Sequence, residues 1–176
     1  KLFSSARSIF QFHQEDRSTV RHFLKLHIIS LCELAWKLEN TNRWEEAADL
    51  YRSALIAGGA DSSISFQLAE LLQRQKDYPG ARERYYVVLE SDRDNIEARA
   101  NLGRVLRELG ETAKAIDAFQ GALALYPDYL DVHYELGCLL FQNGNKEEAG
   151  EHLRRYLNGS PDGPQTDHAI EMLNSK

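Results

Sequence analysis

The strongest constraint on the fold is a repetition of leucine and small residues at intervals of 34 residues. A leucine followed by alanine or glycine recurs at Leu34-Ala35, Leu68-Ala69, Leu102-Gly103 and Leu136-Gly137. A second set with the same interval pairs an alanine with an aromatic residue or leucine four positions later: Ala47 and Tyr51, Ala81 and Tyr85, Ala115 and Phe119, Ala149 and Leu153. Self-similarity at this period is typical of helical repeat arrays, which act mostly as binding surfaces.

Each repeat is predicted to form two helices joined by a short polar turn. Leu102 and Leu106 follow helical spacing, and Gly110 stands where a helix end favours a left-handed residue, as does Gly144. Pro127 ends a second helix, since proline cannot continue one. Because two helices approach closely only over small side chains, the alanines and glycines mark the helix-helix contacts. The four units are residues 28–61, 62–95, 96–129 and 130–163.

The two flanks differ from the repeats. Residues 1–27 form a lead-in: an extended or poorly ordered segment with, at most, a stray strand near 9–12, then a helix capped by Ser18 that runs into the first repeat. Residues 164–176 are predicted to form a capping helix and tail. Ala169, Ile170 and Leu173 share one face there and would cover the last repeat.

Charge and composition exclude several classes of function. The net charge is −6 with 27% charged residues, which argues against a nucleic-acid-binding surface in this segment. No apolar run approaches the roughly 20 residues that span a bilayer. The chain begins at Lys1 rather than Met, which suggests a fragment or a trimmed product. A cytoplasmic location is expected, and a periplasmic one stays open because of that missing start.

Charge distribution and cysteine spacing add two expectations. Residues 1–27 carry five bases and two acids, whereas residues 128–176 carry four bases and nine acids, so end-to-end self-association through opposite charges stays open beside ordinary surface solvation. Cys32 and Cys138 lie in the first and last repeats, too far apart for a disulfide, and are expected to be free thiols.

No catalytic or metal-binding motif is present. The sequence lacks GxSxG, HExxH and phosphate-binding glycine loops, and its six histidines are scattered without i,i+4 pairs. His133 occupies a variable repeat position, where packing explains it better than ligation. We therefore expect a protein that is not an enzyme and that has no cofactor and no metal.

The repeated pattern resembles the tetratricopeptide repeat family, with its small residues, aromatic position and final proline over residues 28–161. The third repeat matches best, and Val88 and Tyr156 depart from a position that is usually alanine. The resemblance implies an all-α fold: a right-handed superhelix of four antiparallel helix pairs and a C-terminal capping helix. Tyr156 is expected to face partly toward the end of the stack.

The resemblance also implies where a ligand would bind. Family members bind protein segments in a concave groove lined by the first helix of each repeat. The matching positions in this chain are Cys32, Trp36, Phe66, Glu70, Gln73, Asn101, Arg104, Arg107, Tyr134 and Phe141. Aromatic residues and arginine dominate binding hot spots, which predicts a protein or peptide ligand with an acidic group. In the alternative, these side chains pack on adjacent helices and the arginines pair with Glu70 or Glu135.

The basic clamp with which some members grip the acidic tails of heat-shock chaperones is missing, because Glu97 or Asp131 stands where it would need a cation. Two function classes remain, with an enzyme as a distant third. One is a scaffold that binds a protein segment. The other is a regulatory or assembly module of a larger protein, since phrases such as the one around His152 resemble the C-terminal repeats of bacterial winged-helix transcriptional regulators.

Overall fold

The computed structural model describes the backbone of residues 2–175 and the side chains of residues 17–175. Regular secondary structure in this part of the chain is entirely helical. Residues 1–75 form one compact unit with α1 (Leu2–Glu39), α2 (Trp44–Gly58) and α3 (Ser62–Arg74). Residues 76–176 form a second unit with α4 (Tyr78–Ser91), α5 (Ile96–Glu108), α6 (Thr112–Leu125), α7 (Leu130–Gln142), α8 (Lys146–Gly159) and α9 (Thr166–Asn174).

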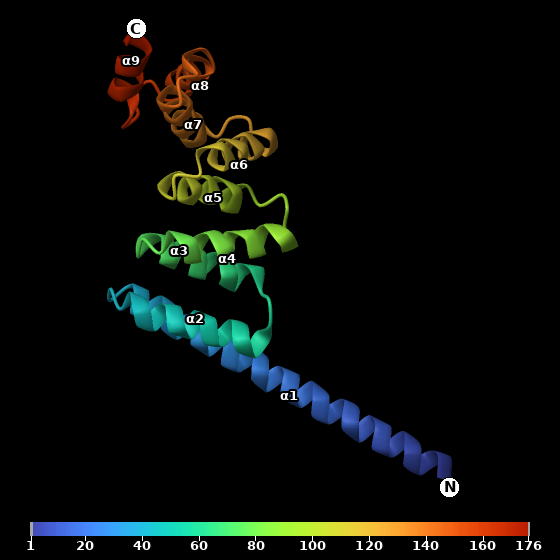
Figure 1. Cartoon of the computed structure of the whole chain (residues 1–176). Helices are drawn as coiled ribbons and strands as arrows, with labels where there is room; N and C mark the ends of the chain where they lie inside the picture. Colours follow the sequence, from blue (N-terminus) through green and yellow to red (C-terminus); the bar gives the residue numbers. More distant parts are fainter. Residues whose placement is uncertain (1, 176) are drawn as a thin grey trace. The chain divides into compact units, whose positions relative to one another are not determined.

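Helix α1 differs from the predicted lead-in. It is a single helix of 38 residues that begins at Leu2, and its N-terminal half extends beyond α2 (Figure 1). The expected extended segment is therefore wrong, and Ser18 lies inside the helix rather than at a cap. Residues 9–12, where at most a stray strand was expected, are helical as well. The physical reason is that residues 2–39 contain neither glycine nor proline, so nothing interrupts the helix once it has formed.

In the first unit, α2 packs against both α1 and α3. The small residues of the repeat, Ala35 on α1 and Ala47 on α2, are completely buried, and Tyr51 is 1% exposed. Ile28 lies against the C-terminal end of α2, where a Cβ on Gly58 would come 2.7 Å from the Ile28 Cδ1 atom. A larger residue at position 58 would therefore require the Ile28 side chain to move.

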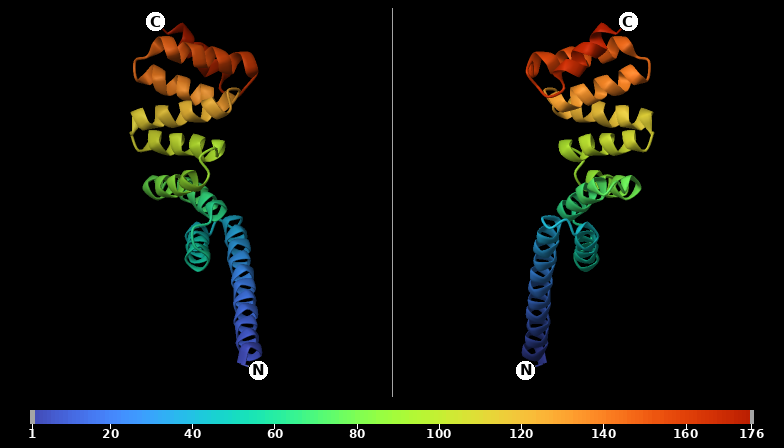
Figure 2. Two further views of the ribbon diagram at one scale, coloured as in Figure 1. Left: turned by 90° about the vertical axis from the view of Figure 1, so that its right-hand side faces the viewer. Right: turned by 90° about the vertical axis from the view of Figure 1, so that its left-hand side faces the viewer.

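In the second unit, each helix from α4 to α9 packs against the next one in the chain, and α5 to α9 form successive layers (Figure 2). A Cβ on Gly103 would lie 2.7 Å from ring atoms of Phe119, and one on Gly137 would lie 2.8 Å from Cγ of Leu153. Separations under about 3 Å are overlaps rather than contacts. The glycine of the first helix, which faces Phe119 or Leu153 of the second helix, thus sets how closely the two helices approach.

The turns within the repeats share one backbone feature. Gly110 and Gly144 have φ angles of 74° and 86°, which confirms the predicted left-handed residues after α5 and α7. Asn42 and Lys76, at the same repeat position in the first two repeats, also have positive φ angles, of 59° and 63°. After α5, the Glu111 N–H donates to the Leu106 carbonyl at 2.9 Å, the bond that ends a helix in a Schellman motif.

The C-terminal helix α9 covers the end of the array as predicted, but with a different face. Ala169 is completely buried and Met172 is 8% exposed, whereas Ile170 is 45% exposed, so Met172 replaces Ile170 in the contact. Tyr156 faces the end of the stack as expected, and α9 covers it there, so that it is 1% exposed. Its hydroxyl donates to Oε1 of Gln165 at 2.7 Å and accepts from the Gln165 N–H at 3.2 Å, which ties α8 to the start of α9.

Two leucines at the same repeat position test the packing. Leu136 is completely buried and Leu34 is 48% exposed, although both precede the small residue of a first helix. We expect Leu136→Ala to lower the free energy of unfolding by roughly 2–5 kcal/mol, because it leaves a cavity in the core. Leu34→Ala should change it by less than about 1 kcal/mol. Urea unfolding followed by circular dichroism measures both, and equal losses would contradict the packing.

A second prediction concerns α9. Deleting residues 164–176 exposes Leu153 and Tyr156 and removes the partner of the Tyr156 hydroxyl. We expect a lower melting temperature and aggregation, since an uncapped repeat presents an apolar end. As matched substitutions, Met172→Ala should lower the melting temperature and Ile170→Ala should not. A truncated chain that stays equally stable and monomeric would show that α9 is a free tail.

Candidate protein-binding surface

In the first unit, two of the predicted inner-face residues line one pocket. Its volume is about 570 Å³, and it lies between α1, the turn after it, α2 and α3. Trp36 and Glu70, both predicted, contribute to its wall. The remaining lining residues are Glu39, Asn40, Asn42, Trp44, Tyr51, Gln67 and Arg74. Cavities of this volume are typical of ligand-binding pockets.

A hydrogen-bonded carboxylate forms part of the wall of this pocket. The Tyr51 hydroxyl donates to Oε1 of Glu39 at 2.7 Å, and Arg74 donates to Oε2 at 3.0 Å. The Glu39 side chain is 13% exposed, so both its oxygens are held in place. Burial and the Glu39 carboxylate together raise the pKa of Tyr51 well above its ordinary value. Tyr51 therefore stays a neutral donor at every physiological pH.

Trp44 and Arg74 belong to the pocket but were not predicted from the sequence. Trp44 is the first residue of α2, outside the first-helix positions from which the groove residues were inferred. The available signal was its identity, because Trp36 and Trp44 are the two tryptophans of the chain. Cys32, Phe66 and Gln73, which were predicted, are each partly buried in the first unit and do not line this pocket.

In the second unit, the structure brings the two predicted arginines together around one carboxylate. Arg104 Nε donates to Oε1 of Glu135 at 2.6 Å, and Arg107 donates to Oε2 at 3.2 Å. Arg104 also donates to Oδ1 of Asn101 at 2.6 Å, and Arg107 to Glu108 at 3.0 Å. The four charges cancel, so this cluster presents fixed guanidinium groups but no net positive charge.

The ion pairs of this cluster are partly buried. The Glu135 side chain is 15% exposed and that of Arg104 is 23% exposed. Burial alone would lower the pKa of Arg104, but the adjacent Glu135 carboxylate outweighs it and the pKa is raised. Replacing a partner by a residue of opposite charge would leave a partly buried charge unpaired, which is destabilising. The arginines thus have the structural role that was the alternative to ligand binding, and ligand contact by them stays a prediction.

Tyr134 and Phe141 of α7 contact the end of the array. The Tyr134 hydroxyl is 2.7 Å from Nδ1 of His168 on α9, and its ring centroid is 5.2 Å from that of Tyr156. Burial and the nearby Cys138 raise the pKa of Tyr134 to about 12. Phe141 packs on the same cluster, with Nζ of Lys146 5.2 Å from its ring centroid. Both predicted groove residues therefore help to hold the last helices together.

The second unit has another pocket, of about 510 Å³, between α4, α5 and α6. Tyr86, Leu89 and Arg93 line one side, and Lys114 and Asp117 line the other. Arg99 also lines this pocket, and its Cδ lies 2.9 Å from the Cβ position of Gly121. Its Nε is buried and, among the described residues, has no hydrogen-bond partner.

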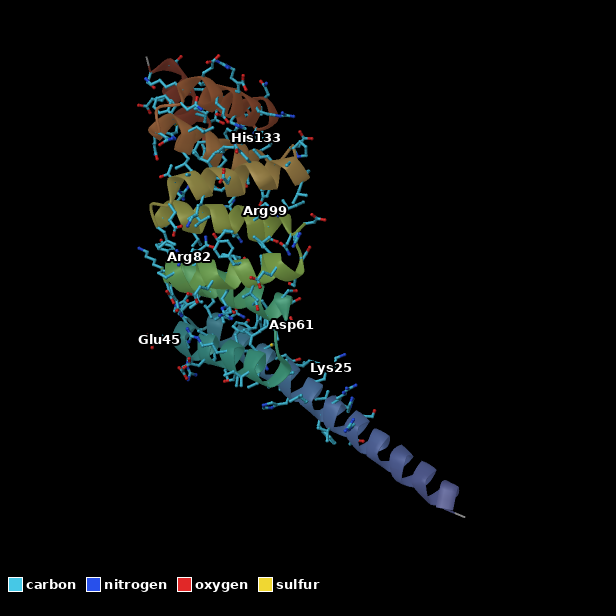
Figure 3. All side chains as sticks on the ribbon, turned by 45° about the vertical axis from the view of Figure 1, so that its right-hand side comes forward. Lys25, Glu45, Asp61, Arg82, Arg99 and His133 are labelled. Carbon is cyan, nitrogen blue, oxygen red and sulfur yellow. The ribbon has the colours of Figure 1, made fainter. Side chains whose placement is uncertain are left out.

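A buried histidine pair joins α7 and α8, and Figure 3 labels His133 in this layer. Nε2 of His133 lies 2.8 Å from the Pro127 carbonyl, and Nδ1 of His133 lies 2.8 Å from Nδ1 of His152. Because the carbonyl only accepts, His133 carries its proton on Nε2 and its Nδ1 accepts from His152. Both pKa values are lowered, first by burial, so the pair is neutral.

Within the described residues, no group of three or more histidine, cysteine, aspartate or glutamate side chains is placed to hold a metal ion. Cys32 and Cys138 are free thiols, and burial raises the pKa of each. No helix in the same part of the chain combines the length and the apolar character needed to cross a membrane.

Comparison with known proteins identifies the class. A family model described as tetratricopeptide repeat matches residues 32–96 and 100–164, which is most of the chain. The chain therefore belongs to the tetratricopeptide repeat family, and the predicted all-α repeat fold is confirmed. This fold is generally a non-catalytic protein-interaction module, so the chain is a protein-interaction module in that general sense.

Individual relatives share this fold. The human protein O-mannosyl-transferase TMTC3 is 31% identical over 126 residues, which cover 69% of this chain but 14% of that protein. A tetratricopeptide repeat protein from Parabacteroides merdae superposes with a TM-score of 0.78 at 20% identity, over 84% of this chain and 59% of that one. MamA protein superposes with a TM-score of 0.76 at 21% identity, over 83% and 87%.

The histidine pair predicts a pH dependence of stability. The lowered pKa values mean that the folded chain binds fewer protons than the unfolded chain just below the ordinary histidine value of about 6.5. Stability is therefore complete above about pH 6.5 and falls as the pH decreases toward the folded-state pKa. The loss should be on the order of 1 kcal/mol, because a protonated His133 Nδ1 no longer accepts from His152.

Urea unfolding between about pH 7.5 and about pH 5.5 measures this effect. His152→Gln keeps a donor for His133 without a second titrating ring and should flatten the dependence. His22→Gln, at an exposed position on α1, is the control and should leave it unchanged. An identical slope in the wild type and in His152→Gln would contradict the assignment.

Proposed function

We propose that this chain binds an extended protein segment on the inner faces of its first helices, with Trp36 as the main apolar contact. The observation that carries the proposal is the exposure of Trp36, which is 60% exposed at a pocket of about 570 Å³. Large exposed aromatic side chains beside a preformed pocket are typical of binding hot spots. The family supports the proposal, because its members are generally protein-interaction modules.

The chemistry of the pocket favours a particular kind of segment. Asn40, Asn42 and Gln67 supply amide donors and acceptors on its wall, which suit the backbone of an extended chain. The oxygens of Glu39 already accept from Tyr51 and Arg74, so this carboxylate is less available to a ligand cation. We therefore expect a segment that places a large apolar side chain on Trp36 and hydrogen-bonds through its backbone.

Within the second unit, we expect a separate contact for an acidic group of a ligand. Arg104 and Arg107 each carry five N–H donors, more than their contacts with Glu135, Asn101 and Glu108 use. A ligand carboxylate there would compete with Glu135 for the same guanidinium groups. Reversing both arginine charges would destabilise the fold, because Glu135 would lose both partners. Milder substitutions are needed to test this contact.

The two tryptophans give a direct measurement. Because Trp36 and Trp44 both line the pocket, ligand binding should change the intrinsic fluorescence of the chain. Partners captured from a cell lysate would be identified by mass spectrometry, and synthetic segments of them would then be titrated. Trp36→Ala should weaken binding by about tenfold or more. Ile56→Ala, at an 85% exposed position of α2, is the matched control and should bind normally.

The same titration tests the acidic group. Glu135→Gln keeps the shape of the side chain and releases the arginines, so it should tighten binding of an acidic segment. Arg107→Gln should weaken it. If Trp36→Ala binds like the wild type while its melting temperature is unchanged, the proposed site is wrong. If only the two substitutions in the second unit have no effect, the ligand carries no acidic contact.

A further inference from the structure

Helix α1 carries an exposed apolar face that has no counterpart in the later repeats. Phe23 is 65% exposed, Val20 60% and Leu24 40%. Leu34 is 48% exposed, whereas the residues at the same repeat position in α3, α5 and α7 are buried: Leu68 at 1%, Leu102 at 4% and Leu136 at 0%. In an array this face of a first helix receives a neighbouring helix. In α1 it is open to solvent.

These side chains form one continuous stripe, which we define as Val20, Phe23, Leu24, His27, Leu31 and Leu34. At 3.6 residues per turn, the six positions fall within an arc of roughly 100°. The adjacent arc carries Ile28 and Ala35, which face α2. The stripe continues N-terminally past the end of α2, onto the free part of α1 where Lys25 lies (Figure 3). Leu26, which is 46% exposed, lies outside it.

Five of the six stripe positions are symmetric about His27, and the sixth, Leu24, has Ser30 at its mirror position. Val20 and Leu34 lie seven residues on either side of it, and Phe23 and Leu31 lie four residues on either side. Apolar positions placed symmetrically about a centre fit a second copy running antiparallel. Val20 would then lie opposite the partner's Leu34, and Phe23 opposite the partner's Leu31. His27 would lie beside the partner's His27 on the two-fold axis.

Charge favours the same arrangement. Arg17, Arg21 and Lys25 lie on the flank of α1 that, further along the helix, is covered by α2. In an antiparallel pair, the partner's α2 would lie beside that flank. Three exposed residues near the N-terminal end of α2 are acidic, namely Glu45, Glu46 and Asp49, of which Glu46 pairs with Arg43 and Asp49 with Arg52. A parallel pair would instead place the partner's α2 at the opposite end of the stripe from the three bases.

We propose that two copies of this chain associate through the stripe on α1 as a symmetric antiparallel dimer. The paired region, residues 20–34, is about 21 Å long. It would remove on the order of 1,000 Å² from water in total, near the lower limit for specific interfaces, so a micromolar dissociation constant is expected. The contact is isologous and closes after two copies. It does not depend on the proposed peptide site, and it differs from end-to-end association through the charged termini.

Disulfide trapping tests the geometry in the full chain with Cys32 and Cys138 replaced by serine. His27→Cys lies on the proposed axis and should form a covalent dimer on mild oxidation. Val20→Cys should not link to itself, because the two copies of that residue would be about 21 Å apart. A mixture of Val20→Cys and Leu34→Cys should link. Self-linking of Val20→Cys would overturn the antiparallel arrangement.

Sedimentation equilibrium tests the association itself. Phe23→Glu should raise the dissociation constant about tenfold or more while the helical circular dichroism is retained. Leu26→Glu makes the same change at a similarly exposed apolar residue outside the stripe and should leave the dimer intact. A wild-type chain that remains monomeric up to about millimolar concentration would overturn the proposal, as would equal effects of the two substitutions.

Discussion

The close approach of two helices at a glycine or alanine is the contact on which the rest of this structure depends. Gly103 and Gly137 leave no room for a Cβ beside Phe119 and Leu153, so the volume of one side chain sets the distance between the two helices of a repeat. Larger residues around this contact then fill the core. A helix pair joined in this way has apolar surface left on both sides, which is why each repeat needs a neighbour.

Much of the fold could be predicted because this contact recurs at a fixed interval. Helices α3, α5 and α7 begin at Ser62, Ile96 and Leu130, 34 residues apart. The left-handed positions of Gly110 and Gly144 followed from residue type, whereas Lys76 takes the same conformation without a glycine to indicate it. The start of α1 was not predicted. The helix extends this far because no glycine or proline interrupts it, and a missing residue type does not stand out as a repeated sequence pattern. Met172 was not predicted because the rotation of α9 about its own axis turns Met172, rather than Ile170, toward Tyr156.

The candidate site was harder to predict, since repeat position identifies the face of a helix but not the partner of a side chain. The inner-face assignment placed Trp36 and Glu70 at one pocket. The same assignment placed Arg104 and Arg107 on α5. Whether their guanidinium groups contact a ligand or Glu135 depends on side-chain positions that repeat position does not specify. Trp44 joins the pocket from a second helix, which a reading confined to first helices could not include.

The two ends of the chain solve the problem of unmatched apolar surface differently. At the C-terminus, α9 lies on the last pair and supplies Ala169 and Met172 to a core around Tyr156, so the repeat pattern ends in a polar surface. At the N-terminus, α1 continues as an isolated helix, and Leu34 stays exposed at a position that is buried in every later repeat. An array that is closed at one end and open at the other can add a neighbour only at the open end. The exposed apolar stripe on α1 is therefore a surface that packing within the chain leaves uncovered and that a partner molecule can cover.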